Sequence, residues 1–205
     1  AITTLLNIQS SNQRRQRLAA NLGVSLEFEP RRRQDIDVIF VATDAGTGRL
    51  LVPQLRFHYA GDIPTYATSA VYESYASDSD LDGVLFPDTP WVLSGDDTSS
   101  QLKASLETYW PQRTAPPWAR LYGLGFDAYR LIPLLHNRLE KFSSITALSG
   151  ELSLGNDGRI RRQLPFAQFR NGRPLVIDAE APRDRSIEVV SDLETEKSTE
   201  LAMLR

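Results

Sequence analysis

Residues 119–177 constrain the fold of this chain more than any other stretch. They read ARLYGLGFDAYRLIPLLHNRLEK, a short connector, and then ITALSGELSLGNDGRIRRQLPFAQFRNGRPLVI. Apolar residues three or four apart in the first part predict a long helix with a core-facing stripe: Leu121, Leu124, Ala128, Leu131, Leu135 and Leu139. The turn sequences GNDG and NG in the second part accept positive φ and predict two successive hairpins.

The upstream sequence alternates strand-like and helix-like segments. Residues 36–42 read IDVIFVA, an almost continuous apolar run that is typical of a strand covered on both faces. A tight turn at 43–48 leads into a predicted helix, and short apolar runs follow at 65–68 and 83–86. This spacing is that of βαβ units, so we predict an α/β fold with a Rossmann-like, mostly parallel sheet flanked by helices and C-terminal β-hairpins.

Three regions follow from this pattern. Residues 1–35 are predicted to be a peripheral helical segment, in which Ser11 caps a helix that ends at Gly23. Residues 36–177 form the α/β lobe. Residues 178–205 hold eight acidic and four basic side chains, and we expect them to be a mobile acidic tail.

Composition excludes several classes of function. The net charge is −3 and the sequence pI about 5.5, so the basic surface of a nucleic-acid-binding domain is missing. The chain contains no cysteine, which rules out thiol catalysis and zinc-thiolate sites, and it has only two histidines, His58 and His136. No nucleophile elbow is present and no pair of carboxylates stands out. We therefore expect no catalytic, metal or cofactor site.

Two short motifs have competing readings. Residues 78–83, DSDLDG, resemble the start of a calcium loop, but Thr89 stands where the loop needs a bidentate Glu, so we read them as a solvated loop. Residues 44–48, DAGTG, lack the third glycine of a dinucleotide-binding motif because Leu51 stands in its place. We read this second motif as a sharp turn into a helix.

Ligands of open α/β sheets bind beyond the carboxyl ends of the strands. The residues predicted to line such a cleft are Thr43, Asp44, Ser69, Tyr72 and Asp127. Asp44 and Asp127 fit equally well as helix N-caps, and that is the reading we favour for both.

Two clusters of basic residues could contact an acidic partner. One is the run RRR at residues 31–33, and the other is a set of arginines in the predicted hairpins: Arg159, Arg161, Arg162, Arg170 and Arg173. Charge runs are most often solvated faces. Strands present alternate residues on one face, so the hairpin set is the better candidate for partner contact.

Several segments carry a family resemblance. GFDA at 125–128 and G-x-L-x-L-x-x-x-G-R at 150–159 resemble the second lobe of type I periplasmic binding proteins. Four longer segments narrow the resemblance: EFEPRRRQDIDVIFVAT at 27–43, LRFHYAGDIPTYATSAVY at 55–72, DLDGVLFPDTPW at 80–91 and QLPFAQFRNGRP at 163–174. Together they resemble the C-terminal domain of the LppC lipoproteins over residues 1–177.

This resemblance implies a function. It implies a non-enzymatic periplasmic regulator, held at the outer membrane by a lipid anchor upstream of this chain, that binds a class A penicillin-binding protein and stimulates peptidoglycan cross-linking. The alternative is a lobe of a periplasmic solute-binding protein that captures an amino acid or a muropeptide.

Overall fold

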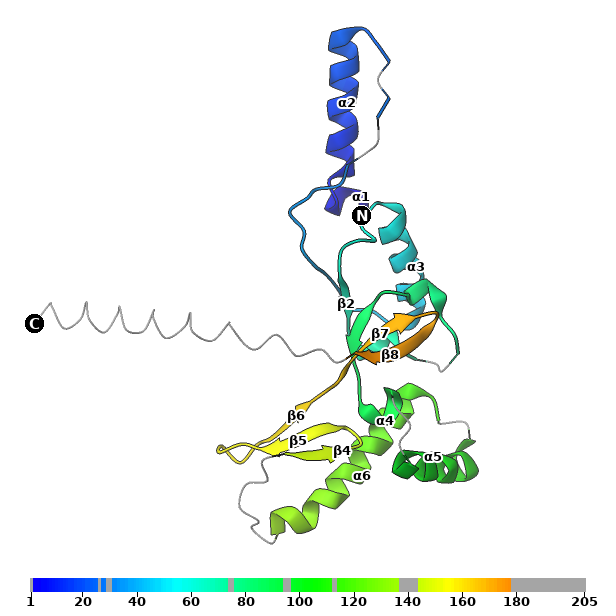
Figure 1. Ribbon diagram of the computed structural model, residues 1–205, viewed down its shortest axis with the longest axis vertical. Coiled ribbons are helices and arrows are strands. Elements are labelled where there is room, and N and C mark those ends of the chain that lie inside the picture. The colour runs from blue at the N-terminus through cyan, green and yellow to red at the C-terminus, as the bar shows by residue number, and fades with distance from the viewer. Residues whose placement is uncertain are drawn as a thin grey trace, which may run out of the picture.

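The computed structural model describes residues 2–25, 27–28, 31–73, 76–93, 97–111, 114–136 and 144–177. The predicted acidic tail at 178–205 lies outside them. Over the described residues the chain is elongated (Figure 1). The N-terminal helices lie at one end, a five-stranded sheet lies in the middle, and a three-stranded sheet with the later helices lies at the other end.

The five-stranded sheet confirms the predicted α/β fold. Its strands are β1 (Ile39–Val41), β2 (Thr65–Ala67), β3 (Leu85–Pro87), β7 (Phe166–Arg170) and β8 (Arg173–Ile177), in the order β1-β2-β3-β7-β8. The first three run parallel, and β7 and β8 add antiparallel pairs at the other edge.

The three-stranded sheet is antiparallel. It consists of β4 (Ile145–Ala147), β5 (Gly150–Leu154) and β6 (Ile160–Gln163). Gly158 has φ 73°, and Asn171 and Gly172 between β7 and β8 have φ 52° and 74°. Both predicted hairpins are therefore confirmed, at the residues that tolerate positive φ.

The helices connect and flank these sheets. They are α1 (Ile2–Leu5), α2 (Ile8–Leu22), α3 (Ala45–Phe57), α4 (Pro90–Leu93), α5 (Asp97–Tyr109) and α6 (Pro116–His136), with single 3₁₀ turns η1 (Ser69–Val71) and η2 (Ser79–Leu81). None of the described helices has both the length and the hydrophobicity needed to cross a bilayer.

The prediction for α2 is correct at one end only. Gly23 ends the helix with φ 67°, as expected. Asn7 precedes its first residue, and Ser11 lies one turn inside it. Ser11 is buried and accepts a hydrogen bond from the backbone N–H of Arg31 at 3.2 Å, so it ties α2 to the following loop instead of capping the helix.

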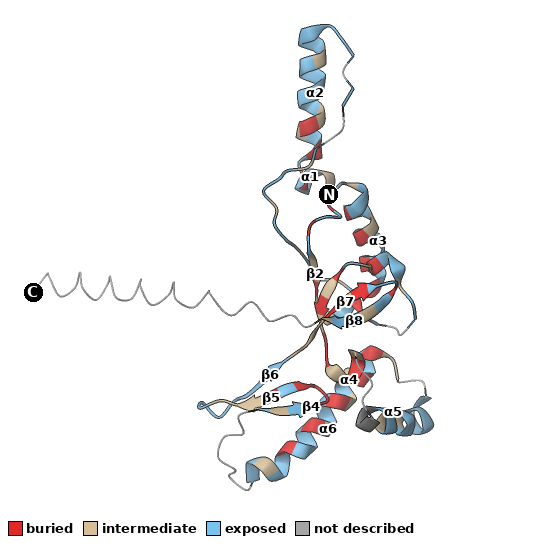
Figure 2. Ribbon diagram, in the orientation of Figure 1, coloured by how far each residue is buried: buried red, intermediate tan, exposed pale blue. Residues whose placement is uncertain are grey.

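The main core lies between one face of the five-stranded sheet and α3, η1, η2 and α4. Its largest fully buried side chains include Trp91, Phe86 and Phe169, and the last two stack with ring centres 5.0 Å apart. Figure 2 shows the buried residues concentrated where the sheet meets α3 and where α4 meets α6.

The other face of this sheet is open within the described residues. Paired residues share a face, and one row across all five strands is Phe40, Tyr66, Leu85, Gln168 and Leu175. Phe40 is 67% exposed and Leu175 is 49% exposed. The expectation that residues 36–42 are covered on both faces is therefore wrong for the described structure, because only the α3 side is packed.

The predicted stripe of α6 also differs from the structure. The residues of α6 that are buried are Pro116, Ala119, Gly123, Asp127 and Leu131. Of the predicted stripe, Leu131 is buried, whereas Leu121, Leu124, Ala128 and Leu135 are exposed and Leu139 lies outside the described residues. Small residues allow α6 to approach Trp91 and Leu148 closely at Gly123, and the larger apolar residues point away from the body.

Candidate functional site

The carboxyl edge of the parallel strands is where open α/β sheets bind ligands. Asp88 directly follows β3, and its side chain is only 1% exposed. Arg120 of α6 donates two hydrogen bonds to it, Nε to Oδ1 at 2.9 Å and Nη2 to Oδ2 at 2.7 Å. This two-pronged geometry is the strong form of an arginine–carboxylate pair.

The same guanidinium also donates hydrogen bonds to the backbone that follows the neighbouring strand, β2. Its Nη2 donates to the backbone oxygens of Ser69 and Tyr72, both at 2.7 Å. The ring of Tyr72 is buried against Phe86 and Phe169. Ser69 and Tyr72, which were both predicted to line a ligand cleft, therefore lie together. Their backbone oxygens accept hydrogen bonds from Arg120 of the same chain.

Asp44 caps α3, as predicted. Its Oδ1 accepts a hydrogen bond from the backbone N–H of Thr47 at 2.7 Å. That N–H stabilises the charged carboxylate and so holds the pKa of Asp44 below its ordinary value. Thr43 precedes the cap and is partly buried.

Asp127 does not cap a helix, because α6 begins at Pro116. Its side chain is 2% exposed, and its two oxygens accept the backbone N–H groups of Leu148 at 3.2 Å and Ser149 at 2.6 Å. These residues form the turn between β4 and β5. The carboxylate thus fixes the three-stranded sheet to the middle of α6.

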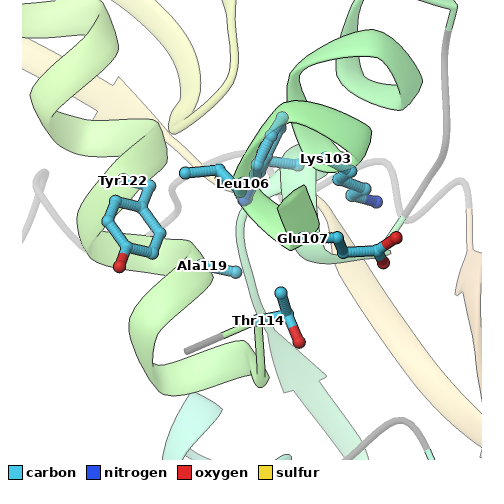
Figure 3. Close-up of a pocket in the computed structure, with 7 residues that line it drawn as sticks. Lys103, Leu106, Glu107, Thr114, Ala119 and Tyr122 are labelled. Atoms are coloured by element: carbon cyan, nitrogen blue, oxygen red, sulfur yellow. The ribbon is translucent and has the colours of Figure 1, made fainter. Parts of the chain in front are cut away.

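A small pocket lies between α5 and α6 (Figure 3). Lys103, Leu106 and Glu107 line it from α5, and Ala119 and Tyr122 line it from α6, with Thr114 and Trp91 completing the wall. Its volume is about 80 Å³, well below the ~300–1,000 Å³ of typical small-molecule sites. It has room for the end of a side chain or a few waters, not for a complete solute.

All five predicted hairpin arginines are exposed, but they belong to two sheets. Arg161 pairs with Ser153 across β5 and β6, and Arg162 pairs with Leu152, so these two arginines point to opposite faces. Arg170 and Arg173 are cross-strand partners in the other hairpin. The set therefore forms separate basic surfaces.

The acidic loop at 78–83 has structural contacts. Asp78 pairs with Arg49 at 2.6 Å, and Asp82 accepts the backbone N–H of Gly172 at 2.7 Å. Among the described residues, no group of three or more His, Cys, Asp or Glu side chains could hold a metal ion. The loop is therefore held by contacts within the fold and is not simply solvated, since the side chain of Asp78 is only 10% exposed.

The sequence model of the family described as "LppC putative lipoprotein" matches residues 1–172, which is most of the chain. The chain belongs to the LppC lipoprotein family.

Curated relatives of this LppC chain are named penicillin-binding protein activator LpoA. The Vibrio cholerae protein is 26% identical over 171 residues, and the Aliivibrio fischeri protein is 28% identical over 174 residues. These matches cover 82% and 81% of this chain. The chain spans only 28% of the length of each relative.

Solved structures support the fold. The LpoA (YraM) C-domain from Haemophilus influenzae, described as a regulator of PBP1A, superimposes with a TM-score of 0.57 at 16% identity, covering 82% of this chain and 56% of that one. A "putative branched-chain amino acid ABC transporter" from Rhodospirillum rubrum gives a TM-score of 0.52 at 18% identity, covering 69% and 44%. The fold of this LppC chain is thus that of the LpoA C-domain and resembles periplasmic binding proteins.

Sequence reasoning missed the pair of Arg120 and Asp88. Both residues lie in segments that the sequence analysis quoted, but nothing there marks them as a pair, and they are 32 positions apart. Asp88 lies two residues beyond the strand predicted at 83–86 and directly after the observed β3, as a residue at the carboxyl edge should. That signal could have added it to the candidates, whereas nothing local marks Arg120 as its partner.

Proposed function

We propose that this chain is part of a non-enzymatic periplasmic regulator that binds a class A penicillin-binding protein and stimulates peptidoglycan cross-linking. Membership of the LppC family and the names of the curated relatives support this proposal. The same membership supports anchoring at the outer membrane through a lipid. The chain spans 28% of the length of those relatives. The proposal therefore concerns what this part contributes to the activity of a longer protein.

One structural observation favours a regulator over a solute receptor. Arg120 bonds to Asp88 and to the backbone oxygens of Ser69 and Tyr72. These groups stand at the edge where a solute would be recognised. A ligand there would have to displace a guanidinium that already satisfies a buried carboxylate, at a large cost in free energy.

Regulation requires the partner to have two conformations that this protein binds with different affinity, since equal affinity shifts no equilibrium. The contacts we propose first are the exposed arginines of the β5–β6 hairpin, Arg159, Arg161 and Arg162, which lie on both faces of that hairpin. Arg170 and Arg173, in the β7–β8 hairpin, form a separate basic surface. Arginine is enriched at protein–protein contacts because its planar group bonds carboxylates through two donors.

The experiment is a cross-linking assay with a purified class A penicillin-binding protein, with and without this chain. We expect more cross-linked product in its presence. The joint variant Arg159→Glu, Arg161→Glu and Arg162→Glu should lose the stimulation while retaining its fold. Arg17→Glu, on exposed α2, is the control and should retain it. An unchanged cross-linking rate together with no measurable binding would refute the proposal.

A further inference from the structure

A second, larger and more open cavity is lined by residues of α2 and of the segment that follows it. Helix α2 lies at one end of the molecule (Figure 1). The volume of the cavity is about 500 Å³, within the ~300–1,000 Å³ of typical small-molecule sites. Ser11, Arg14, Arg15 and Leu18 line it from α2. Spacings of three, four and seven place these four residues on one face of the helix.

The opposite wall comes from the loop that follows α2. Glu27, Phe28 and Arg31 line the cavity from that side. The loop is tied to α2 by the hydrogen bond from the backbone N–H of Arg31 to Ser11 Oγ, whose residue is 3% exposed. The two walls are therefore joined by a partly buried hydrogen bond.

The described lining of the cavity is mainly basic. Its described residues include three arginines, Arg14, Arg15 and Arg31, and one glutamate, Glu27. Within the described residues, the side chains of Arg14 and Arg31 form no ion pair or hydrogen bond. An unpaired cluster of this kind attracts anions, because each guanidinium can bond a carboxylate or phosphate through two donors.

The neighbouring arginines show that this is not a uniformly solvated basic run. Arg32 pairs with Asp62 at 2.7 Å and donates to the backbone oxygen of Tyr59 at 2.6 Å. Arg33 pairs with Asp35 through two hydrogen bonds of 2.6 Å and holds the pKa of Asp35 at about 2. Arg32 and Arg33 are therefore engaged in ion pairs within the fold. Of the three arginines, Arg31 is the one that lines the cavity.

The cavity also has an apolar wall. The guanidinium of Arg15 lies 5.7 Å from the ring centre of Phe28, a cation–π contact that positions both groups. Leu18 adds aliphatic surface beside them. A ligand that fits both kinds of wall carries acid groups at one end and a flat or aliphatic part at the other.

We propose that this cavity binds a small organic anion with at least two carboxylate or phosphate groups. The site is separate from the carboxyl edge of the sheet and from the hairpin arginines, so it adds a small-molecule interaction to the proposed regulator. Arg14 and Arg31 bind the acid groups, Phe28 and Leu18 contact the remainder, and Glu27 limits the affinity for ligands without a positive charge.

The test is isothermal titration calorimetry of the 205-residue chain with two probes, citrate and pyrophosphate. We expect saturable binding of at least one probe, and the tighter of the two identifies the acid group as carboxylate or phosphate. Arg14→Gln and Arg31→Gln should each weaken binding about tenfold, the loss expected for one charge-assisted contact.

Two further variants distinguish a specific binding site from general electrostatic attraction of anions. Arg17→Gln removes the same charge from the same helix without touching the cavity, and it should change the affinity less than about twofold. Glu27→Gln should tighten binding several-fold because it removes the repelling carboxylate, a gain that a damaged fold cannot produce. The inference is overturned if neither probe binds saturably, if Arg17→Gln weakens binding as much as Arg14→Gln, or if Glu27→Gln leaves the affinity unchanged.

Discussion

Arg120 and Asp88 join α6 to the carboxyl end of β3 through hydrogen bonds of 2.7 and 2.9 Å. The side chain of Asp88 is almost completely buried, and that of Arg120 is 18% exposed. Since a buried charge without its partner is costly, this contact fixes how the helices beyond β3 attach to the five-stranded sheet.

Replacing Arg120 should therefore destabilise the chain strongly. We expect Arg120→Met to lower the free energy of unfolding by about 3 kcal/mol, because it leaves Asp88 buried and unpaired. Urea unfolding followed by circular dichroism measures the change. Arg161→Met is the matched control: its pair with Asp157 is exposed and 3.8 Å long, so the loss should stay below about 0.5 kcal/mol. Equal losses would contradict the role given to the buried pair.

Asp127→Asn should loosen the three-stranded sheet from α6. The amide offers one acceptor oxygen for the two N–H groups of Leu148 and Ser149, and its NH₂ group faces a donor. We expect a loss of about 1–3 kcal/mol in the free energy of unfolding, with faster hydrogen exchange at Ser149. Unchanged exchange at that amide would show that the carboxylate does not hold the turn.

Glycine at position 172 is required for two reasons. It has φ 74°, and a Cβ there would meet the side chain of Ser77 and come within 2.9 Å of the backbone nitrogen of Asp78. Gly158 has almost the same φ, 73°, but open space around it. We expect Gly158→Ala to cost about 1 kcal/mol from backbone strain alone and Gly172→Ala to cost about 2–3 kcal/mol. Similar melting temperatures for the two variants would contradict this difference.

The N-cap of α3 should depend on pH. The pKa of Asp44 is lowered in the folded chain, so its contribution to stability is complete above the ordinary carboxyl pKa and is lost as pH falls through the lowered value. Asn also caps helices but does not titrate. Asp44→Asn should therefore lose less thermal stability than the natural chain as the pH falls below the ordinary carboxyl pKa. Identical acid profiles would rule out this dependence.

Local features of this fold were predictable from the sequence. The turn at Asn171 and Gly172, the cap at Asp44 and the exit of α2 at Gly23 each depend on one residue and its immediate neighbours. Asp127 was misread because its partners lie 21 and 22 positions away. A carboxylate accepts a distant N–H as readily as a local one, and sequence spacing cannot tell these cases apart.

The apolar pattern of α6 predicted a helix correctly but not the face that is buried. Periodicity shows that Leu121 and Leu124 share a side, whereas burial depends on what packs there. Within the described residues, the side of Gly123 is packed and the leucine side is open. The pairing of Arg120 with Asp88 could not be predicted from the sequence either, because it depends on how α6 crosses the end of β3.

We propose that this chain contacts a peptidoglycan synthase. The most direct measurement is the affinity of the purified 205-residue chain for an immobilised class A penicillin-binding protein. We expect saturable binding, weakened by the joint glutamate variant of Arg159, Arg161 and Arg162 and unchanged by Arg17→Glu. No saturable binding by the natural chain would contradict it.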